Sequence, residues 1–218
     1  MQAKGQRSKI LIVGSGFGGL GMAIRLKQQG IHDFKIIERA AEVGGTWRDN
    51  TYPGVACDVP SHLYSFSFIK NPNWSRVFPQ GVEIQRYLIQ CCDQENIRPH
   101  INFHTQLEKA SWNARERIWE IHTSIGLYQA EILITATGHL ADEHLPKIPG
   151  LEEFEGQVMH SARWNHELNL ENQHVVVVGS GASAIQLVPE ISKTAKSLTV
   201  LQRGAPYILP RPDRAYSE

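Results

Sequence analysis

The sequence has few cysteines, no excess of either charge and no long apolar run. Its 218 residues include three cysteines and equal numbers of basic and acidic residues, 22 of each. Because the cysteine number is odd, Cys91 and Cys92 are adjacent and no C-x-x-C occurs, neither a disulfide framework nor a redox dithiol is predicted. The balanced charge offers no positive field to nucleic acid or to an anionic membrane. We therefore expect a small-molecule partner and leave the oligomeric state open.

The apolar runs are also too short for a membrane span or a signal peptide. Met1–Ser8 is polar, and the apolar run Lys9–Val13 stops at Gly14, whereas a span needs about 20 apolar residues. Together with the cysteines, this predicts a soluble cytoplasmic protein. His100 and His104 have the spacing of helical metal ligands, but the intervening sequence favours a strand, so no metal site is expected.

What the sequence does contain is a strand, a glycine-rich turn and a helix in direct succession. Lys9–Val13 is rich in β-branched residues, as buried strands are. A GxGxxG follows at 14–19, and a helical pattern then runs to Gly30. Phe34–Ile37 is predicted to be the second strand and delivers Glu38 at its end. This order is typical of a dinucleotide-binding unit.

Each residue of the turn has a physical reason to be there. Gly14 permits the tight turn, Gly16 lets the backbone approach a pyrophosphate, and Gly19 lets the helix pack on the strand. The motif also contains Gly18. The carboxylate of Glu38 is suited to accept hydrogen bonds from a ribose hydroxyl. A plain structural turn remains the alternative reading.

The connection at 39–58 is long and shows little periodicity. Long irregular connections in compact domains tend to be functional, and Trp47 and Tyr52 offer flat apolar surfaces for an aromatic ring system. An ordinary surface loop with one buried tryptophan explains the composition equally well.

The middle of the chain predicts one helix and a small antiparallel sheet. Val82–Glu95 carries apolar residues at helical spacing, with Cys91 on the buried face and Cys92 on another. Four strands are then expected, which form a meander that returns into the main sheet: Ile101–His104, Leu107–Trp112, Ile118–Thr123 and Leu127–Thr135.

The first stretch then recurs. His174–Val178 is a predicted strand, 179–184 is a GxGxxA, Ile185–Lys193 is a predicted helix, and Leu198–Leu201 is the next predicted strand. Arg203 follows Gly179 at the same interval of 24 residues that separates Glu38 from Gly14.

This equal spacing predicts that Glu38 and Arg203 occupy the same structural slot. An acid there repels a 2′-phosphate, whereas an arginine pairs with one. We therefore expect two nucleotides, FAD at the first turn and NADPH at the second, in preference to two copies of NAD. The alternative for Arg203 is a solvated charge at the end of a strand.

The fold class expected is α/β. It comprises a Rossmann-like FAD-binding domain with a small antiparallel β-meander at 1–144 and a linker at 145–173. The beginning of a second Rossmann-like, NADPH-binding domain follows at 174–218. The proline-punctuated stretch 145–150 marks the first boundary. A dinucleotide-binding half needs roughly three strands, so the second unit is expected to be cut short.

Two longer motifs resemble those of the flavin-dependent Baeyer–Villiger monooxygenases. Their pattern FxGxxxHxxxW, followed by Pro or Asp, is matched except at its last position, where Asn165 stands; the matching residues are Phe154, Gly156, His160 and Trp164. A second pattern, GGxW and then YPGxxxD, is met in full by Gly44, Gly45, Trp47, Tyr52, Pro53, Gly54 and Asp58.

This resemblance implies a set of site residues. The expected FAD contacts, in addition to the first turn, are Glu38, Gly45, Thr46, Trp47, Asp58, Tyr64 and the backbone at Leu107. The expected NADPH contacts are Gly179, Ser180, Gly181, Ala182, Ser183, Ala184, Ile185, Gln202 and Arg203. Asp58 and His160 are the implied catalytic candidates, Asp58 by tuning an arginine beside the flavin and His160 at a hinge between domains.

The resemblance also implies the reaction. NADPH reduces FAD, dioxygen adds to give a peroxyflavin, and attack on a ketone yields an ester or lactone. An N- or S-oxygenating or hydroxylating flavin monooxygenase, or a non-catalytic nucleotide-binding fragment, is the alternative. Family members are longer, so we expect these residues to be the N-terminal part of such an enzyme, inactive alone.

Overall fold

A computed structural model describes residues 6–217, so the first five residues of the polar stretch Met1–Ser8 lie outside the described part. The chain divides into two compact units. Unit 1 comprises Met1–Arg48 and Gln85–Ala141, and unit 2 comprises Asp49–Ile84 and Asp142–Glu218. Within residues 6–217, no helix combines the length and the apolar character that crossing a membrane requires.

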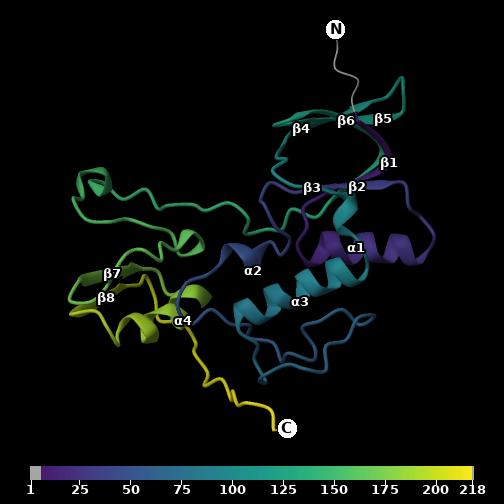
Figure 1. Cartoon of the computed structure of the whole chain (residues 1–218). Coiled ribbons are helices and arrows are strands. Elements are labelled where there is room, and N and C mark those ends of the chain that lie inside the picture. Colours follow the sequence, from purple (N-terminus) through teal and green to yellow (C-terminus); the bar gives the residue numbers. More distant parts are fainter. Residues whose placement is uncertain (1–5, 218) are drawn as a thin grey trace. The chain divides into compact units, whose positions relative to one another are not determined.

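Unit 1 is built on one mixed sheet (Figure 1). The strand order is β3-β2-β1-β6-β5-β4, in which β1, β2, β3 and β6 pair in parallel and β4, β5 and β6 pair antiparallel. The strands are β1 (Gln6–Val13), β2 (Phe34–Ile37), β3 (Ile101–Asn102), β4 (Leu107–Asn113), β5 (Ile118–Thr123) and β6 (Gly126–Thr135). The predicted meander that returns into the main sheet is confirmed for β4, β5 and β6. The first of its four predicted strands was wrongly included, because β3 pairs in parallel with β2 at the other edge of the sheet.

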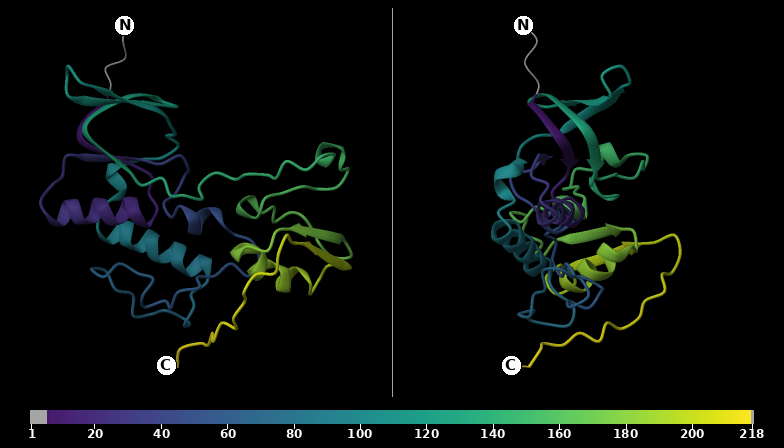
Figure 2. Two further views of the ribbon diagram at one scale, coloured as in Figure 1. Left: turned by 180° about the vertical axis from the view of Figure 1, so that it is seen from behind. Right: turned by 90° about the vertical axis from the view of Figure 1, so that its right-hand side faces the viewer.

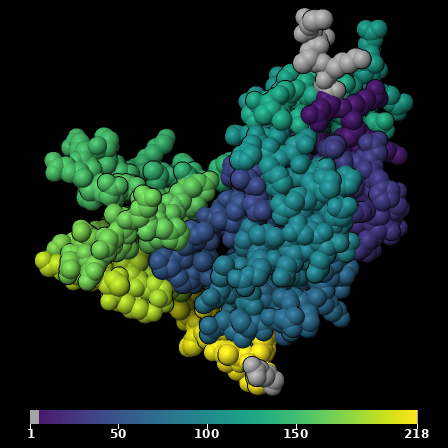
Figure 3. Space-filling view, in the orientation of Figure 1, coloured from purple at the N-terminus to yellow at the C-terminus, as the bar shows by residue number. Residues whose placement is uncertain are grey.

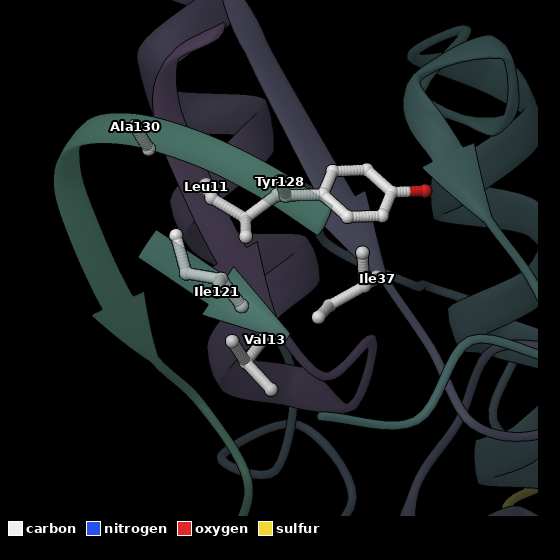
Figure 4. Close-up of a cluster of buried hydrophobic side chains, with 6 residues drawn as sticks. All are labelled: Leu11, Val13, Ile37, Ile121, Tyr128 and Ala130. Carbon is white, nitrogen blue, oxygen red and sulfur yellow. The ribbon is translucent and has the colours of Figure 1, made fainter. Parts of the chain in front are cut away.

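The core of the sheet lies where the meander meets the parallel strands (Figure 4). Leu11 and Val13 of β1 form one buried cluster with Tyr128 of β6. The hydroxyl of Tyr128 accepts a hydrogen bond from Nδ2 of Asn102 at 2.8 Å, so this large ring is buried with its polar atom satisfied. The cluster is completed by Ile37, Ile121 and Ala130.

Two helices accompany this sheet, α1 (Phe17–Gln28) and α3 (Gly81–Gln94), and they run close together in both views of Figure 2. The rings of Phe17 and Tyr87 lie 6.3 Å apart between centroids. One face of α1 points into the core, because Leu20, Ala23 and Ile24, which recur at helical spacing, are fully buried. Gly30 follows α1 with a φ of +75°, a conformation that glycine adopts without strain.

Unit 2 contains the second predicted strand, helix and strand. The strands β7 (His174–Val178) and β8 (Ser197–Leu201) pair in parallel, and the helix α4 (Ala182–Ile191) connects them. Leu187 and Ile191 of α4 form a buried cluster with Tyr52. Two short 3₁₀ helices precede this motif, η2 (Leu151–Glu153) and η3 (Ser161–Arg163).

The C-terminal segment of unit 2 is tied to residues 75–78. The amide of Val77 donates to the Arg214 carbonyl at 3.0 Å, and the amide of Phe78 donates to Oδ1 of Asp213 at 3.2 Å. Figure 3 shows this yellow segment on the surface beside the blue part of the chain. After Gly204, the described residues up to 217 contain no helix or strand, apart from an isolated bridge between Ala215 and Arg76.

The structure corrects three local predictions. The connection at 39–58 is not wholly irregular, because it contains the short helix α2 (Thr46–Asp49). The strand predicted from Ile101 is shorter and is preceded by a 3₁₀ helix, η1 (Arg98–His100), in which Pro99 is tolerated in the first turn.

The third correction concerns α3. Cys92 was expected on a face away from the core, yet it is as fully buried as Cys91. The reason is the return of the chain after α3, where Asn96 adopts a φ of +49° and the amide of Ile97 donates to the Cys92 carbonyl at 2.9 Å. Ile97 itself is fully buried.

Candidate functional site

The first glycine-rich turn is packed so tightly that two of its glycines, Gly14 and Gly19, leave no room for a Cβ. Gly14 has a φ of +98°, and its amide donates to the Ile37 carbonyl at 2.8 Å. A Cβ on Gly14 would lie 2.5 Å from the Ala136 carbonyl oxygen, and a Cβ on Gly19 would lie 1.8 Å from that of Gly14. The roles predicted for these two glycines, in the turn and in helix packing, are therefore confirmed.

The helix that follows begins without a side chain over its amino end. Gly16 is the N-cap of α1 and makes no side-chain hydrogen bond, and the first turn carries no acidic residue. A Cβ on Gly16 would meet nothing closer than the Cα of Gly45, at 3.7 Å. No acidic residue of the first turn and no capping side chain compensates the positive end of the helix dipole, an arrangement that fits the pyrophosphate of a dinucleotide.

Glu38 lies underneath this turn and is 4% exposed. Its Oε2 accepts hydrogen bonds from the backbone amide and the hydroxyl of Ser15, at 2.9 and 2.7 Å. Its Oε1 accepts one from the amide of Ala40 at 3.0 Å and forms an ion pair with Nη1 of Arg48, also at 3.0 Å. Four donors thus hold the carboxylate in place, and Glu38 orients the turn itself in addition to any contact with a ribose.

Sequence reasoning missed Arg48. It follows Trp47 inside α2, and no spacing rule connects it with Glu38. Its Nη1 also donates to the Glu42 carbonyl at 2.7 Å. The only available signal was that a buried acid needs a cation, and the sequence offers several.

A second turn, Val43–Trp47, lies against the first. The amide of Gly44 donates to the Ser15 carbonyl at 3.0 Å, and Nε2 of Gln85 donates to the Val43 carbonyl at 2.6 Å. Gly44 has a φ of +126°, which favours glycine, so the GGxW motif needs its first glycine for the backbone conformation. In this way unit 1 brings together most of the predicted FAD contacts, namely residues 14–19, Glu38, Gly45, Thr46 and Trp47.

The remaining predicted FAD contacts, Leu107, Asp58 and Tyr64, do not lie in these two turns. Leu107 is half-buried in β4 of unit 1. Asp58, which is exposed, and Tyr64, which is half-buried, belong to unit 2. Their contact with FAD stays a prediction.

The second glycine-rich turn has the same backbone conformation and hydrogen bond as the first, but its glycines have free space around them. Gly179 has a φ of +113°, its amide donates to the Leu201 carbonyl at 2.8 Å, and Gly181 is the N-cap of α4. No atom lies within 4 Å of a Cβ built on Gly179 or Gly181. No side chain caps the amino end of α4 by a hydrogen bond, so this turn also fits a dinucleotide phosphate.

The register of the strands corrects the predicted equivalence of Glu38 and Arg203. Val13 lies opposite Ile37, and Val178 lies opposite Leu201. The residue directly after the second strand is therefore Glu38 in the first motif and Gln202 in the second. Arg203 corresponds to Arg39. The equal spacing in sequence was misleading because the second motif is one residue shorter between its glycine and the end of its strand.

The motif FxGxxxHxxxW belongs to unit 2, where Phe154 and Gly156 are exposed and His160 and Trp164 are half-buried. A Cβ on Gly156 would lie 2.5 Å from the Phe154 ring, and Nδ1 of His160 accepts a hydrogen bond from the Ala162 amide at 3.1 Å, which caps η3. Trp164 packs against the cluster around Tyr52. The predicted hinge role of His160 stays a prediction.

Asn165, the departure from the motif, keeps the turn that an aspartate would make. Its Oδ1 accepts a hydrogen bond from the amide of Glu167 at 2.9 Å, the arrangement of an Asx-turn. The amide oxygen of asparagine accepts this hydrogen bond as a carboxylate oxygen of aspartate would.

The cysteines have no chemical role that the structure supports. All three are free and buried. Burial raises the pKa of the Cys91 and Cys92 thiols to about 11 and also raises the pKa of Cys57. Among residues 6–217, no group of three or more potential ligands could hold a metal ion, and His100 instead stacks on Phe34 at 4.3 Å.

Comparison with known proteins places this geometry in a family. Residues 11–217 match the family described as pyridine nucleotide-disulphide oxidoreductase. The chain belongs to this family. Within residues 6–217, the three cysteines are free and buried, so none of them forms a disulphide there.

Individual relatives are more specific. A "Baeyer-Villiger monooxygenase" of Streptomyces coelicolor is 50% identical over 209 residues, which are 96% of this chain and 40% of the relative. Cyclohexanone monooxygenase from Rhodococcus sp. Phi1 bound to NADP+ superimposes with a TM-score of 0.93 at 31% identity, covering 99% of this chain and 41% of that one. The OTEMO complex with FAD and NADP has a TM-score of 0.92 at 30% identity, covering 99% and 42%.

The resemblance to Baeyer–Villiger monooxygenases that the motifs predicted is thereby confirmed, and so is the Rossmann-like α/β fold. The chain spans about 40% of the length of the relatives that it matches.

Proposed function

We propose that this protein is an FAD- and NADPH-dependent Baeyer–Villiger monooxygenase, which inserts one oxygen atom from dioxygen next to the carbonyl of a small-molecule ketone. The observation that carries this proposal is the presence of two glycine-rich turns with one backbone plan but different residues after the second strand, Glu38 and Gln202. The names of the relatives favour the same reaction.

In this proposal the first turn holds FAD. The amino end of α1 faces the pyrophosphate, since no acidic residue of its first turn and no capping side chain compensates the helix dipole. Glu38 fixes Ser15 and, through it, the shape of the turn. Bound FAD supplies the redox and oxygen chemistry, while residues of the chain bind and orient it.

The second turn holds NADPH. A carboxylate in the slot of Gln202 would repel a 2′-phosphate, whereas the neutral amide does not, and the exposed Arg203 next to it can pair with the phosphate. Gly179, Gly181 and the first turn of α4 offer backbone amides to the pyrophosphate. Asp58 is the candidate for a charged group near the flavin and His160 for a hinge.

The extent of these domains and the activity of the 218 residues alone are also proposals. We infer an FAD-binding domain at 1–144, a linker at 145–173 and an NADPH-binding domain that starts at 174. Among residues 6–217, the second sheet consists of β7 and β8, whereas a dinucleotide-binding half has roughly three strands. We therefore expect these residues alone to bind FAD weakly and to turn over no ketone. The free cysteines support a cytoplasmic location.

The test is product analysis with protein from the full reading frame, FAD, NADPH and a mixture of a cyclic ketone and a thioether. A lactone as the main product, with one NADPH consumed for each, supports the proposal. Sulfoxide without lactone would favour the heteroatom-oxygenating alternative. A protein that stays without flavin absorbance after reconstitution would favour a non-catalytic nucleotide-binding role.

A further inference from the structure

Gln186, which none of the motifs includes, connects α4 with the segment that precedes Asp58. It lies one residue after the predicted NADPH contacts 179–185, in the second turn of the helix. Its Nε2 donates to the Ala56 carbonyl at 2.8 Å, and its Oε1 accepts from the Ala56 amide at 3.3 Å. The side-chain amide thus pairs with a backbone as a neighbouring strand would.

Two further contacts seat the same segment on α4. The hydroxyl of Tyr52 donates to Oε1 of Gln186 at 2.9 Å, and the ring of Tyr52 is buried against Leu187 and Ile191. Gly54 has a φ of +82°, and a Cβ there would lie 2.7 Å from the backbone oxygen of Gln186. The tyrosine and the glycine of the YPG motif are therefore needed where the segment packs directly on α4.

The other edge of the segment is fixed as well. The amide of Cys57 donates to the Pro79 carbonyl at 2.9 Å, and the amide of Gly81 donates to the Val55 carbonyl at 3.0 Å. Between these two edges, the side chain of Gln186 hydrogen-bonds the backbone of Ala56 and so connects the segment to α4. Asp58 follows Ala56 by two residues and is itself exposed, so its position is set by the backbone before it.

From this geometry we propose that Gln186 is a positioning residue for Asp58 and couples it to the second glycine-rich turn. A dinucleotide at 179–185 fixes the amino end of α4, and Gln186 passes this restriction to residues 52–58. The inference rests on the proposed function, because it requires an NADP-type ligand at that turn. It goes beyond the proposed function by naming a link between the nicotinamide site and the acidic residue assigned to the flavin.

Hydrogen exchange of the protein from the full reading frame, with and without saturating NADP+, tests the link. In the parent, NADP+ is expected to slow exchange of the amides at 55–59 and those of β7 by about fivefold, the lower end of ordinary couplings between sites. In Gln186→Leu, which has similar volume and no polar atom, β7 is still protected by NADP+, whereas 55–59 are not.

Three control variants sharpen this test. Gln173→Leu makes the same change at an exposed glutamine of unit 2 and is expected to behave like the parent. Tyr52→Phe removes one contact of Gln186 but leaves its pairing with Ala56, so protection of 55–59 is retained. Gln186→Glu keeps the acceptor and loses the donor, and is expected to recover part of the protection if it binds NADP+.

The outcomes separate the two claims. Protection of 55–59 in Gln186→Leu equal to that in the parent would overturn the inference, and so would a parent that binds NADP+ without protection of 55–59. A parent that binds no NADP+ at any concentration tested would overturn the two-nucleotide proposal and the inference together.

Discussion

The two glycine-rich turns have the same backbone and very different surroundings. In both, the amide of the first glycine donates at 2.8 Å to the last residue of the second strand, and a glycine caps the following helix. Around the first turn, a Cβ would collide with backbone at Gly14 and Gly19. Around the second, Gly179 and Gly181 have open space, and the third motif position is already Ala184.

The residue after the second strand of each motif also differs in burial between the two turns. Glu38 is buried and held by four donors, whereas Gln202 is exposed. The glycine motif thus determines the path of the backbone in both turns. The packing around each turn determines whether a glycine can be replaced, and the residue after the second strand determines which nucleotide the turn can bind.

The largest expected difference between the two turns is in their tolerance of a methyl group. Gly19→Ala places a Cβ 1.8 Å from a backbone oxygen, so we expect a loss of about 3 kcal/mol in the free energy of unfolding. Gly181→Ala is the matched control and should cost less than about 1 kcal/mol, since its φ of −74° suits alanine and nothing is near. Urea unfolding of both variants measures this; equal losses would contradict the comparison.

The thiols allow the stability of the two units to be followed separately. Because burial raises the pKa of Cys91 and Cys92 in unit 1 from 9.0 to about 11, we expect about a hundredfold less thiolate in the folded protein than in the unfolded one at pH 8. The folded state keeps these protons longer, so stability is unaffected below pH 9 and falls as the pH rises toward 11.

Alkylation at pH 8, with peptide mapping, checks this expectation, and Cys57 reports on unit 2 in the same sample. Labelling of Cys91 and Cys92 in the native protein at the rate of the denatured protein would refute it.

A smaller difference is expected when the residues after the second strand are exchanged. Glu38→Gln leaves Arg48 without its carboxylate, which should lower the free energy of unfolding by about 2 kcal/mol. The reciprocal change Gln202→Glu lies on the surface and should alter it by less than about 0.5 kcal/mol. Thermal or urea unfolding compares the two; a stable Glu38→Gln variant would mean that the ion pair with Arg48 contributes little.

Much of the fold could be predicted because it depends on local patterns. The apolar runs of β1 and β2, the inward face of α1 and the recurrence of the motif at β7 follow from periodicity and glycine placement. The partners of Glu38 and of the YPG motif could not be predicted, since Arg48 and Gln186 reach them through tertiary contacts that no spacing encodes.

The equivalence of Glu38 with Arg203 failed for a related reason. Counting residues assumes that the turn, helix and connection have the same length in both motifs, and only the strand register shows that Gln202 stands in the slot of Glu38. The assignment of NADPH to the second turn therefore no longer depends on a charge opposite to that of Glu38. It depends on the neutral Gln202 in the slot of Glu38 and on Arg203 next to Gln202.

The most direct test of the central claim is therefore the nicotinamide preference of Gln202→Glu. Titration calorimetry of NADP+ and NAD+ with the parent, Gln202→Glu and Arg203→Ala would measure it. A new carboxylate in this slot should shift the ratio of the two affinities toward NAD+ by about tenfold or more, through repulsion of the 2′-phosphate. A Gln202→Glu variant that prefers NADP+ as strongly as the parent does would contradict the account.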